Sequence, residues 1–259
     1  MSATAGVGIL NQMKIRLRDR ILWGLFIGGE GAKAYLTSKL FLWTLPKYSR
    51  KKYRLLVGRL VREGIISQAI IEGKVNYRLS EMGKKQLLTS YPVLGIENKA
   101  WDGFWRIVIF DIPESQRILR DKLRQYLLKM GFGELQNSTY VSAYDYQKEF
   151  LQWLKEHHLE KNVLLLESKQ KYLGEPKLLG EKVWGIEKLN SGYKQIIDRL
   201  TTRFGLKDEA RREEWLKKVY RDYLEVLLQD PWLPVELLGE NWQGEKAKKY
   251  LLRAVVARE

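Results

Sequence analysis

The order of strand-like and helix-like patterns between residues 104 and 167 constrains the fold of this chain more than any other feature. Unbroken apolar runs are typical of buried strands, and apolar positions at helical spacing are typical of amphipathic helices. The expected order is strand, helix, strand, strand, helix, strand, at residues 104–110, 114–130, 134–144 with a bend near Asn137, 146–157 and 163–167. This βαββαβ order predicts a ferredoxin-like domain with both helices on one face of the sheet.

The first third of the chain has a different order, in which three helical patterns precede a β-hairpin. The helices are expected at residues 11–27, 32–44 and 49–63, and the strands at residues 65–71 and 74–79. Glu72 and Gly73 suit the turn between the strands, and Ser80 suits the N-cap of a further short helix. Three helices followed by a hairpin predict a winged helix, which is a variant of the helix-turn-helix.

Positive charge is concentrated in the same third. Residues 1–92 hold 17 Lys and Arg against 5 Asp and Glu, whereas the other 167 residues hold 29 against 26. The first group therefore carries +12 of the net charge of +15. A surface that only needs to stay hydrated does not require this asymmetry, so we expect a polyanionic partner, with double-stranded DNA or RNA first. An anionic membrane surface is the alternative.

The helix expected at 49–63 separates apolar from basic residues. At 100° per residue, Tyr53, Leu56, Val57 and Leu60 share an inward face, and Gly64 follows as a helix stop. Cations with a glycine among them on the opposite face suit close approach to phosphates, although a solvated basic face is the alternative. The candidate DNA-binding residues are Ser49, Arg50, Lys51, Lys52, Arg54, Gly58, Arg59 and Arg62 on this helix, and Lys74, Asn76 and Arg78 alternating along the hairpin.

Several classes of protein are excluded or disfavoured by composition. Cys is absent, so disulfides and thiolate metal sites are excluded, and a reducing cytoplasm is the expected location. No stretch reaches the roughly 20 apolar residues of a membrane span, so we expect no membrane insertion. The basic and then apolar segment before Glu30 is interpreted as a core helix rather than a secretion signal.

The last third is expected to be helical and rich in aromatic residues. Its helical patterns cover residues 186–203, 209–228 and 244–257. A loop with Trp232 and Trp242 precedes the last helix. Aromatic residues at helical spacing usually form a core, although these could also hold an apolar ligand or contact a second protomer.

Three segments resemble the PaaX-like transcription regulators, the repressors of phenylacetate catabolism. They read WDGFWRIVIFDIPE, LRDKLRQYLLKMGFGELQNSTYVS and DPWLPVELLGENWQG. The resemblance implies an α+β chain with three domains: a DNA-binding winged helix at 1–92, a ferredoxin-like dimerisation domain at 99–180 and a helical domain at 181–259. It also implies a homodimer that needs no catalytic residue or cofactor. An aryl-acyl-coenzyme A effector would act on the domains beyond the winged helix.

Asp111 leaves two alternatives open. The central domain of this family is similar to a small CRISPR-associated ferredoxin-like nuclease and spacer-integration subunit, in which a strand ends in an aspartate that can bind a divalent metal between two protomers. Asp111 matches that position, and a metal-dependent nuclease using Mg²⁺ is the alternative function. Asp111 also lies just ahead of Pro113, where a carboxylate can cap the next helix. We favour the helix cap, because a lone aspartate is a weak catalytic signal.

Overall fold

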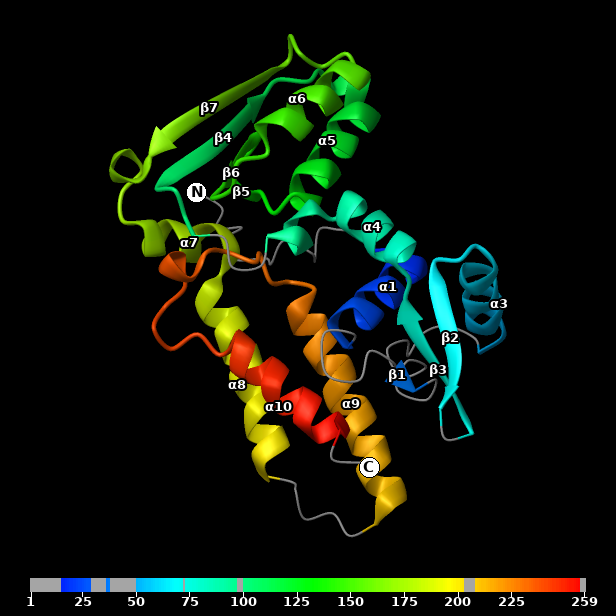
Figure 1. Ribbon diagram of the computed structural model, residues 1–259. Helices are drawn as coiled ribbons and strands as arrows, with labels where there is room; N and C mark the ends of the chain where they lie inside the picture. Colours follow the sequence, from blue (N-terminus) through cyan, green and yellow to red (C-terminus); the bar gives the residue numbers. More distant parts are fainter. Residues whose placement is uncertain are drawn as a thin grey trace. The chain divides into compact units, whose positions relative to one another are not determined.

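Helices and two small antiparallel sheets make up the α+β structure, as expected from the sequence (Figure 1). The computed structural model describes residues 15–28, 36–37, 50–71, 73–96, 100–202 and 208–256. Within these residues, no helix is both long enough and apolar enough to cross a bilayer. The chain divides into two units, of which one holds residues 91–189 and 229–242, and the other holds residues 15–90, 190–228 and those from 243 onward. The division into three domains stays a prediction.

The first unit is built on a four-stranded antiparallel sheet with the order β5-β6-β4-β7. Its elements are β4 (Phe104–Phe110), α5 (Arg117–Lys129), β5 (Gly133–Gln136), β6 (Thr139–Ser142), α6 (Gln147–Glu156), β7 (Val163–Lys169) and α7 (Pro176–Trp184). Strands and helices follow one another in the expected order. The expected bend near Asn137 is the turn between β5 and β6, where Ser138 has a φ of 59°.

The two faces of this sheet are covered differently. Helices α5 and α6 lie on one face of the sheet (Figure 1). The rings of Tyr126 of α5 and Trp153 of α6 stack there with their centroids 4.7 Å apart. On the opposite face, Trp184 of α7 stacks on Trp105 of β4. A Cβ atom on Gly133 of β5 would lie 2.2 Å from Val183 Cγ1, so α7 packs directly on the glycine backbone. The sheet of the first unit is therefore covered by α5 and α6 on one face, and by α7 over one end of the opposite face.

Asp111 does not cap α5, so the predicted cap is wrong. Pro113 is extended, with φ −61° and ψ 155°, and a short 3₁₀ turn (Glu114–Gln116) separates it from α5. The helix begins at Arg117 rather than 114, and neither the turn nor α5 has a side-chain cap. Asp111 uses its main chain instead, because its N–H donates to the Asn162 carbonyl at 2.9 Å and its carbonyl accepts from Asn162 Nδ2 at 3.1 Å. Its carboxylate is exposed.

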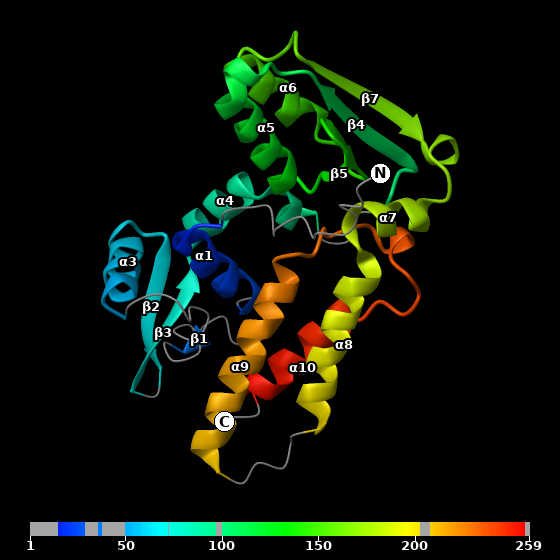
Figure 2. The same ribbon diagram turned by 180° about the vertical axis from the view of Figure 1, so that it is seen from behind.

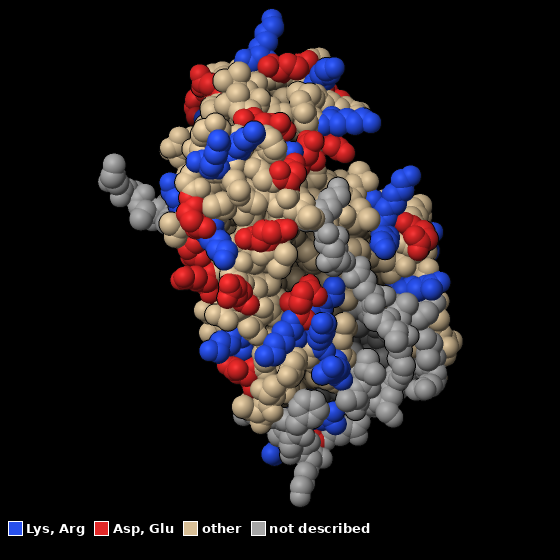
Figure 3. Space-filling model, turned by 60° about the vertical axis from the view of Figure 1, so that its left-hand side comes forward, with Lys and Arg blue, Asp and Glu red and all other residues tan. Residues whose placement is uncertain are grey.

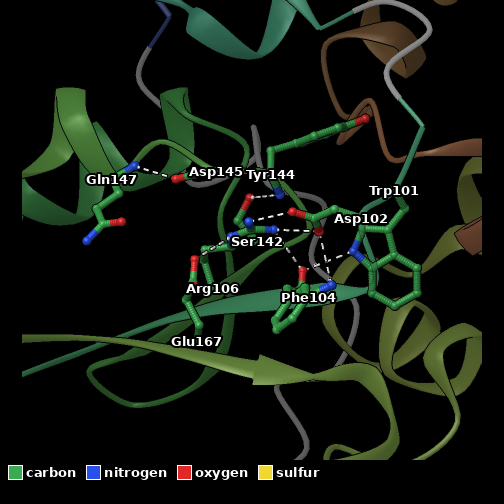
Figure 4. A network of polar contacts seen from close by, with 9 residues as sticks. All are labelled: Trp101, Asp102, Phe104, Arg106, Ser142, Tyr144, Asp145, Gln147 and Glu167. Carbon is green, nitrogen blue, oxygen red and sulfur yellow. Dashed lines mark hydrogen bonds and ion pairs between the residues drawn. The ribbon is translucent and has the colours of Figure 1, made fainter.

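A buried arginine organises the beginning of β4 (Figure 4). The side chain of Arg106 is only 6% exposed, and it donates to both carboxylate oxygens of Asp102 at 2.5 and 2.7 Å and to Glu167 of β7 at 3.2 Å. Hydrogen bonding to Arg106 lowers the pKa of Asp102. Asp102 also accepts the N–H of Phe104 at 3.0 Å. The network therefore ties the entry of β4 to the edge strand β7, which indicates a structural role.

The second unit contains a three-stranded sheet with helices beside it (Figure 2). Its first elements are α1 (Leu17–Gly28), β1 (Leu36–Thr37), α3 (Arg50–Arg62), β2 (Ile66–Ile71), β3 (Lys74–Leu79) and α4 (Glu81–Ser90). Leu36 and Thr37 pair with Tyr77 and Asn76 of β3, so the predicted helix over 32–44 is wrong at these two residues. The rest of that range lies outside the described residues. Pairing with the free edge of β3 outweighs the local helical pattern.

The chain turns sharply between α3 and β2. Gly64 has a φ of +69°, its N–H donates to the Val61 carbonyl at 3.0 Å, and the N–H of Ile65 donates to the Leu60 carbonyl at 2.9 Å. These bonds form a Schellman motif, so the predicted helix stop is confirmed. Ser80 Oγ accepts the N–H of Gly83 at 3.0 Å, which confirms the predicted cap of α4.

The C-terminal helices of the second unit pack on its N-terminal part. Helices α8 (Ile186–Thr202), α9 (Glu209–Leu227) and α10 (Gly244–Val256) lie where the sequence predicts them. Tyr220 of α9 donates its hydroxyl to the Gly24 carbonyl of α1 at 3.2 Å, and Arg20 pairs with Glu225 at 2.6 Å. The first and last thirds of the chain therefore share one core within this unit.

Candidate nucleic-acid interface

One face of α3 carries a row of exposed cations. Lys51, Lys52, Arg54, Arg59 and Arg62 are exposed, and together with the Gly58 backbone we call them the basic face of α3. Three apolar side chains on the other side of the helix are buried in the core of the unit: Tyr53, Val57 and Leu60. The predicted separation of the two faces is therefore confirmed for these three, while Leu56, the fourth residue of the predicted inward face, is half-buried. Helix α3 itself contains no acidic residue, so its exposed side attracts anions along its whole length.

Gly58 leaves a flat position in the middle of the basic face. A Cβ atom built on it would meet nothing within 4 Å. The core therefore does not require a glycine here, and a helix interior is a costly place for one. Because glycine has no side chain, another backbone can approach the helix closely at this position. The phosphate backbone along a DNA groove is one such partner.

Arg59 has an acidic partner. Its Nε donates to Glu63 at 2.6 Å, one turn further along, and this hydrogen bond raises the pKa of the Arg59 guanidinium. Both side chains are on the surface, so the pair contributes little to stability. A phosphate would have to compete with Glu63 for this guanidinium. We therefore expect Arg59 to contribute less to anion binding than Lys51, Arg54 and Arg62.

The hairpin residues do not share one exposed side. Arg78 of β3 is exposed, but Asn76 is only 4% exposed, so the prediction that Asn76 lies on the solvent side is wrong. Asn76 is buried because β3 is the central strand, where it lies between Thr37 of β1 and Ala69 of β2. Lys74 begins β3 and Arg50 begins α3, but their side chains lie outside the described part of the chain, as does all of Ser49.

Three exposed apolar side chains of α3 and the hairpin were not among the predicted DNA-binding residues. Leu55 is 65% exposed, on the same side of α3 as Lys51 and Arg62. Ile70 and Val75, which are cross-strand partners beside the hairpin turn, are exposed as well. The helical projection that selected the cations also places Leu55 on the basic face.

Charge is distributed differently on the first unit. On the face in Figure 3, basic and acidic side chains are interspersed. Some cations of this unit are paired with acidic residues of the same unit, as Arg120 is with Glu114 at 2.7 Å. As for metals, the described residues include no group of three His, Asp or Glu side chains close enough together to hold an ion.

Comparisons with known proteins place the chain in a family. The model of the "PaaX protein central Cas2-like domain" matches residues 98–179, and that of the "PaaX-like protein C-terminal domain" matches residues 184–257. The transcriptional repressor PaaX of Escherichia coli K12 is 24% identical over 239 residues, which are 88% of this chain and 75% of the repressor. The uncharacterized protein Rv0674 of Mycobacterium tuberculosis shares the fold, with a TM-score of 0.53, 18% identity, and 92% and 93% of the two chains covered. These two models of one family match consecutive segments that together make up more than half of this chain, so the chain belongs to the PaaX-like family.

Proposed function

We propose that this protein is a transcriptional regulator that binds operator DNA as a homodimer through a winged helix. The observation that carries the proposal is the row of exposed cations on α3, on the side of the helix opposite the core. The order α1, β1, α3, β2, β3, α4 and the strand order β1-β3-β2 suit a winged helix with α3 as the helix that enters the major groove. The similarity to a transcriptional repressor supports regulation by binding, with no catalytic step.

Selection of bound duplexes from random DNA tests this function. We expect enrichment of an inverted repeat, because a two-fold dimer reads two half-sites in opposite directions. The centres of the half-sites should lie about 10 base pairs apart or a multiple of that distance. Binding without sequence enrichment would instead indicate a DNA-organising protein, and failure to bind duplex DNA would exclude a DNA-binding regulator.

The central sheet offers a surface for dimerisation. Ile107 and Ile109 of β4 lie directly across from Leu166 and Leu164 of β7, on the face opposite α5 and α6. Leu164 is 62% exposed and Leu166 is 45% exposed, while Ile109 is exposed and Ile107 half-buried. We call these four residues the outer-face patch. A contiguous apolar patch on a sheet suits a self-complementary two-fold interface, because the same surface is then buried on both protomers. The arrangement β5-β6-β4-β7 also suits the ferredoxin-like domain to which we assign this role.

Charges placed in the outer-face patch should separate the protomers. Leu164→Asp with Leu166→Asp would bury four carboxylates in a two-fold interface, so the dimer dissociation constant should rise at least about a hundredfold. Sedimentation velocity checks this change. The control is Leu178→Asp with Val235→Asp, which replaces two other exposed apolar residues of the same unit. A double variant at 164 and 166 that dimerises like the wild type would exclude the patch as the interface.

The effector and the nuclease alternative rest on the family resemblance, and the cytoplasmic location rests on the absence of Cys. An aryl-acyl-coenzyme A effector and a cytoplasmic location stay predictions. The alternative of a metal-dependent nuclease requires a dimer in which two copies of Asp111 lie close enough to share a divalent ion such as Mg²⁺. The exposed carboxylate of Asp111 is compatible with such sharing, but the proposed regulator does not need it.

A further inference from the structure

Leu55 lies at the centre of the basic face of α3. Lys51, Leu55, Gly58 and Arg62 follow one another at spacings of four, three and four residues, so they form one stripe along the helix. Arg54 and Arg59 flank this stripe on its two sides. Leu55 is 65% exposed, although the apolar residues on the opposite side of α3 are buried. A single exposed leucine is common on protein surfaces. A leucine framed by cations and next to an open glycine indicates a more specific role.

The frame around Leu55 matches the chemistry of a DNA major groove. Phosphates line both sides of the groove, where Lys and Arg bind them, and base edges form its floor. The side chain at the centre of the helix face then meets the base edges. The apolar group that a base presents in the major groove is the C5-methyl of thymine. An anionic protein surface would also attract the cations, but the regular stripe along one straight helix favours a groove.

We propose that Leu55 contacts a thymine methyl group in each half-site and so helps to determine sequence specificity, while the surrounding cations bind phosphates. This inference rests on the proposed function, because it requires α3 to enter the major groove. The flat position at Gly58 allows the helix to approach closely enough for the leucine to reach the base edges. A leucine offers no hydrogen bond, so it would favour thymine over other bases through apolar contact alone.

Replacing thymidine by deoxyuridine tests this contact, because their bases, thymine and uracil, differ only in the methyl group. Each thymine of a selected half-site is replaced in turn, and the dissociation constant of the wild type and of Leu55→Ala is measured. We expect one position at which the wild type loses about three- to tenfold in affinity, as burial of one methyl group would give. Leu55→Ala should bind the two duplexes equally at that position, while Met82→Ala, which truncates an exposed apolar residue of α4, should keep the full difference.

The outcomes separate the two proposals. If no duplex is enriched in the selection, the proposed function itself fails. If duplexes are enriched but the wild type is insensitive to every methyl group, only the role of Leu55 is refuted. The same conclusion follows if Leu55→Ala still distinguishes thymine from deoxyuridine as the wild type does. Circular dichroism of Leu55→Ala should match the wild type, because the truncated side chain is outside the core.

Discussion

Replacing Lys51, Arg54 and Arg62 together by alanine should remove most of the DNA affinity and flatten its salt dependence. Each phosphate contact contributes a slope of about −0.9 to the plot of log affinity against log salt concentration. If each cation binds one phosphate, the slope should become shallower by about 3, and the affinity at 0.1 M salt should fall about 500-fold. Fluorescence anisotropy with a labelled duplex between 50 and 300 mM salt measures both quantities.

A charge-matched control separates the role of α3 from the effect of net charge. Lys148, Lys155 and Lys161 are exposed residues of the first unit, and their replacement by alanine also removes three positive charges. This control should keep nearly the full affinity and slope. Similar losses in both triple variants would mean that only the total charge matters. Wild-type binding by the Lys51, Arg54 and Arg62 variant would refute the assignment of α3 to DNA.

The elements that could be predicted from sequence are those whose local pattern and packing agree. The apolar face of α3 is a regular helical stripe, and Gly64 and Ser80 mark the ends of adjacent helices with the hydrogen bonds expected of them. The βαββαβ order could likewise be predicted, because each strand is bounded by turn residues. The basic face follows from the same stripe, since residues that do not pack inward face the solvent.

The failures have a common physical cause, which is that partners distant in sequence decide the conformation. Leu36 and Thr37 form a strand because β3 offers them an edge, and Asn76 is buried because strands flank it on both sides. Asp111 continues the extended chain of β4 instead of capping α5, because its N–H and carbonyl are both bonded to Asn162. None of these partners is visible in a local window of sequence.

Gly83→Ala should strongly destabilise the second unit. A Cβ atom on Gly83 would lie 2.1 Å from the carbonyl oxygen of Ile65, which is main chain and cannot rotate away as a side chain can. That carbonyl accepts the N–H of Ser80 at 3.1 Å, so moving it breaks the junction between β3 and α4. Overpacking together with a lost buried hydrogen bond should lower the free energy of unfolding by about 3 kcal/mol or more. Hydrogen exchange followed by mass spectrometry should show faster exchange in residues 60–90, while residues 104–169 keep their protection.

Gly58→Ala is the matched control, because it makes the same chemical change on another helix of the same unit. A Cβ atom on Gly58 meets nothing within 4 Å, and alanine loses less conformational entropy than glycine in a helix. The free energy of unfolding should therefore rise by about 0.5–1 kcal/mol. Opposite signs for the two variants would establish that the destabilisation at Gly83 comes from the Ile65 carbonyl and not from a general intolerance of alanine. Wild-type exchange rates in Gly83→Ala would mean that α4 does not pack against this carbonyl, and the attachment of the hairpin to the core would have to be redrawn.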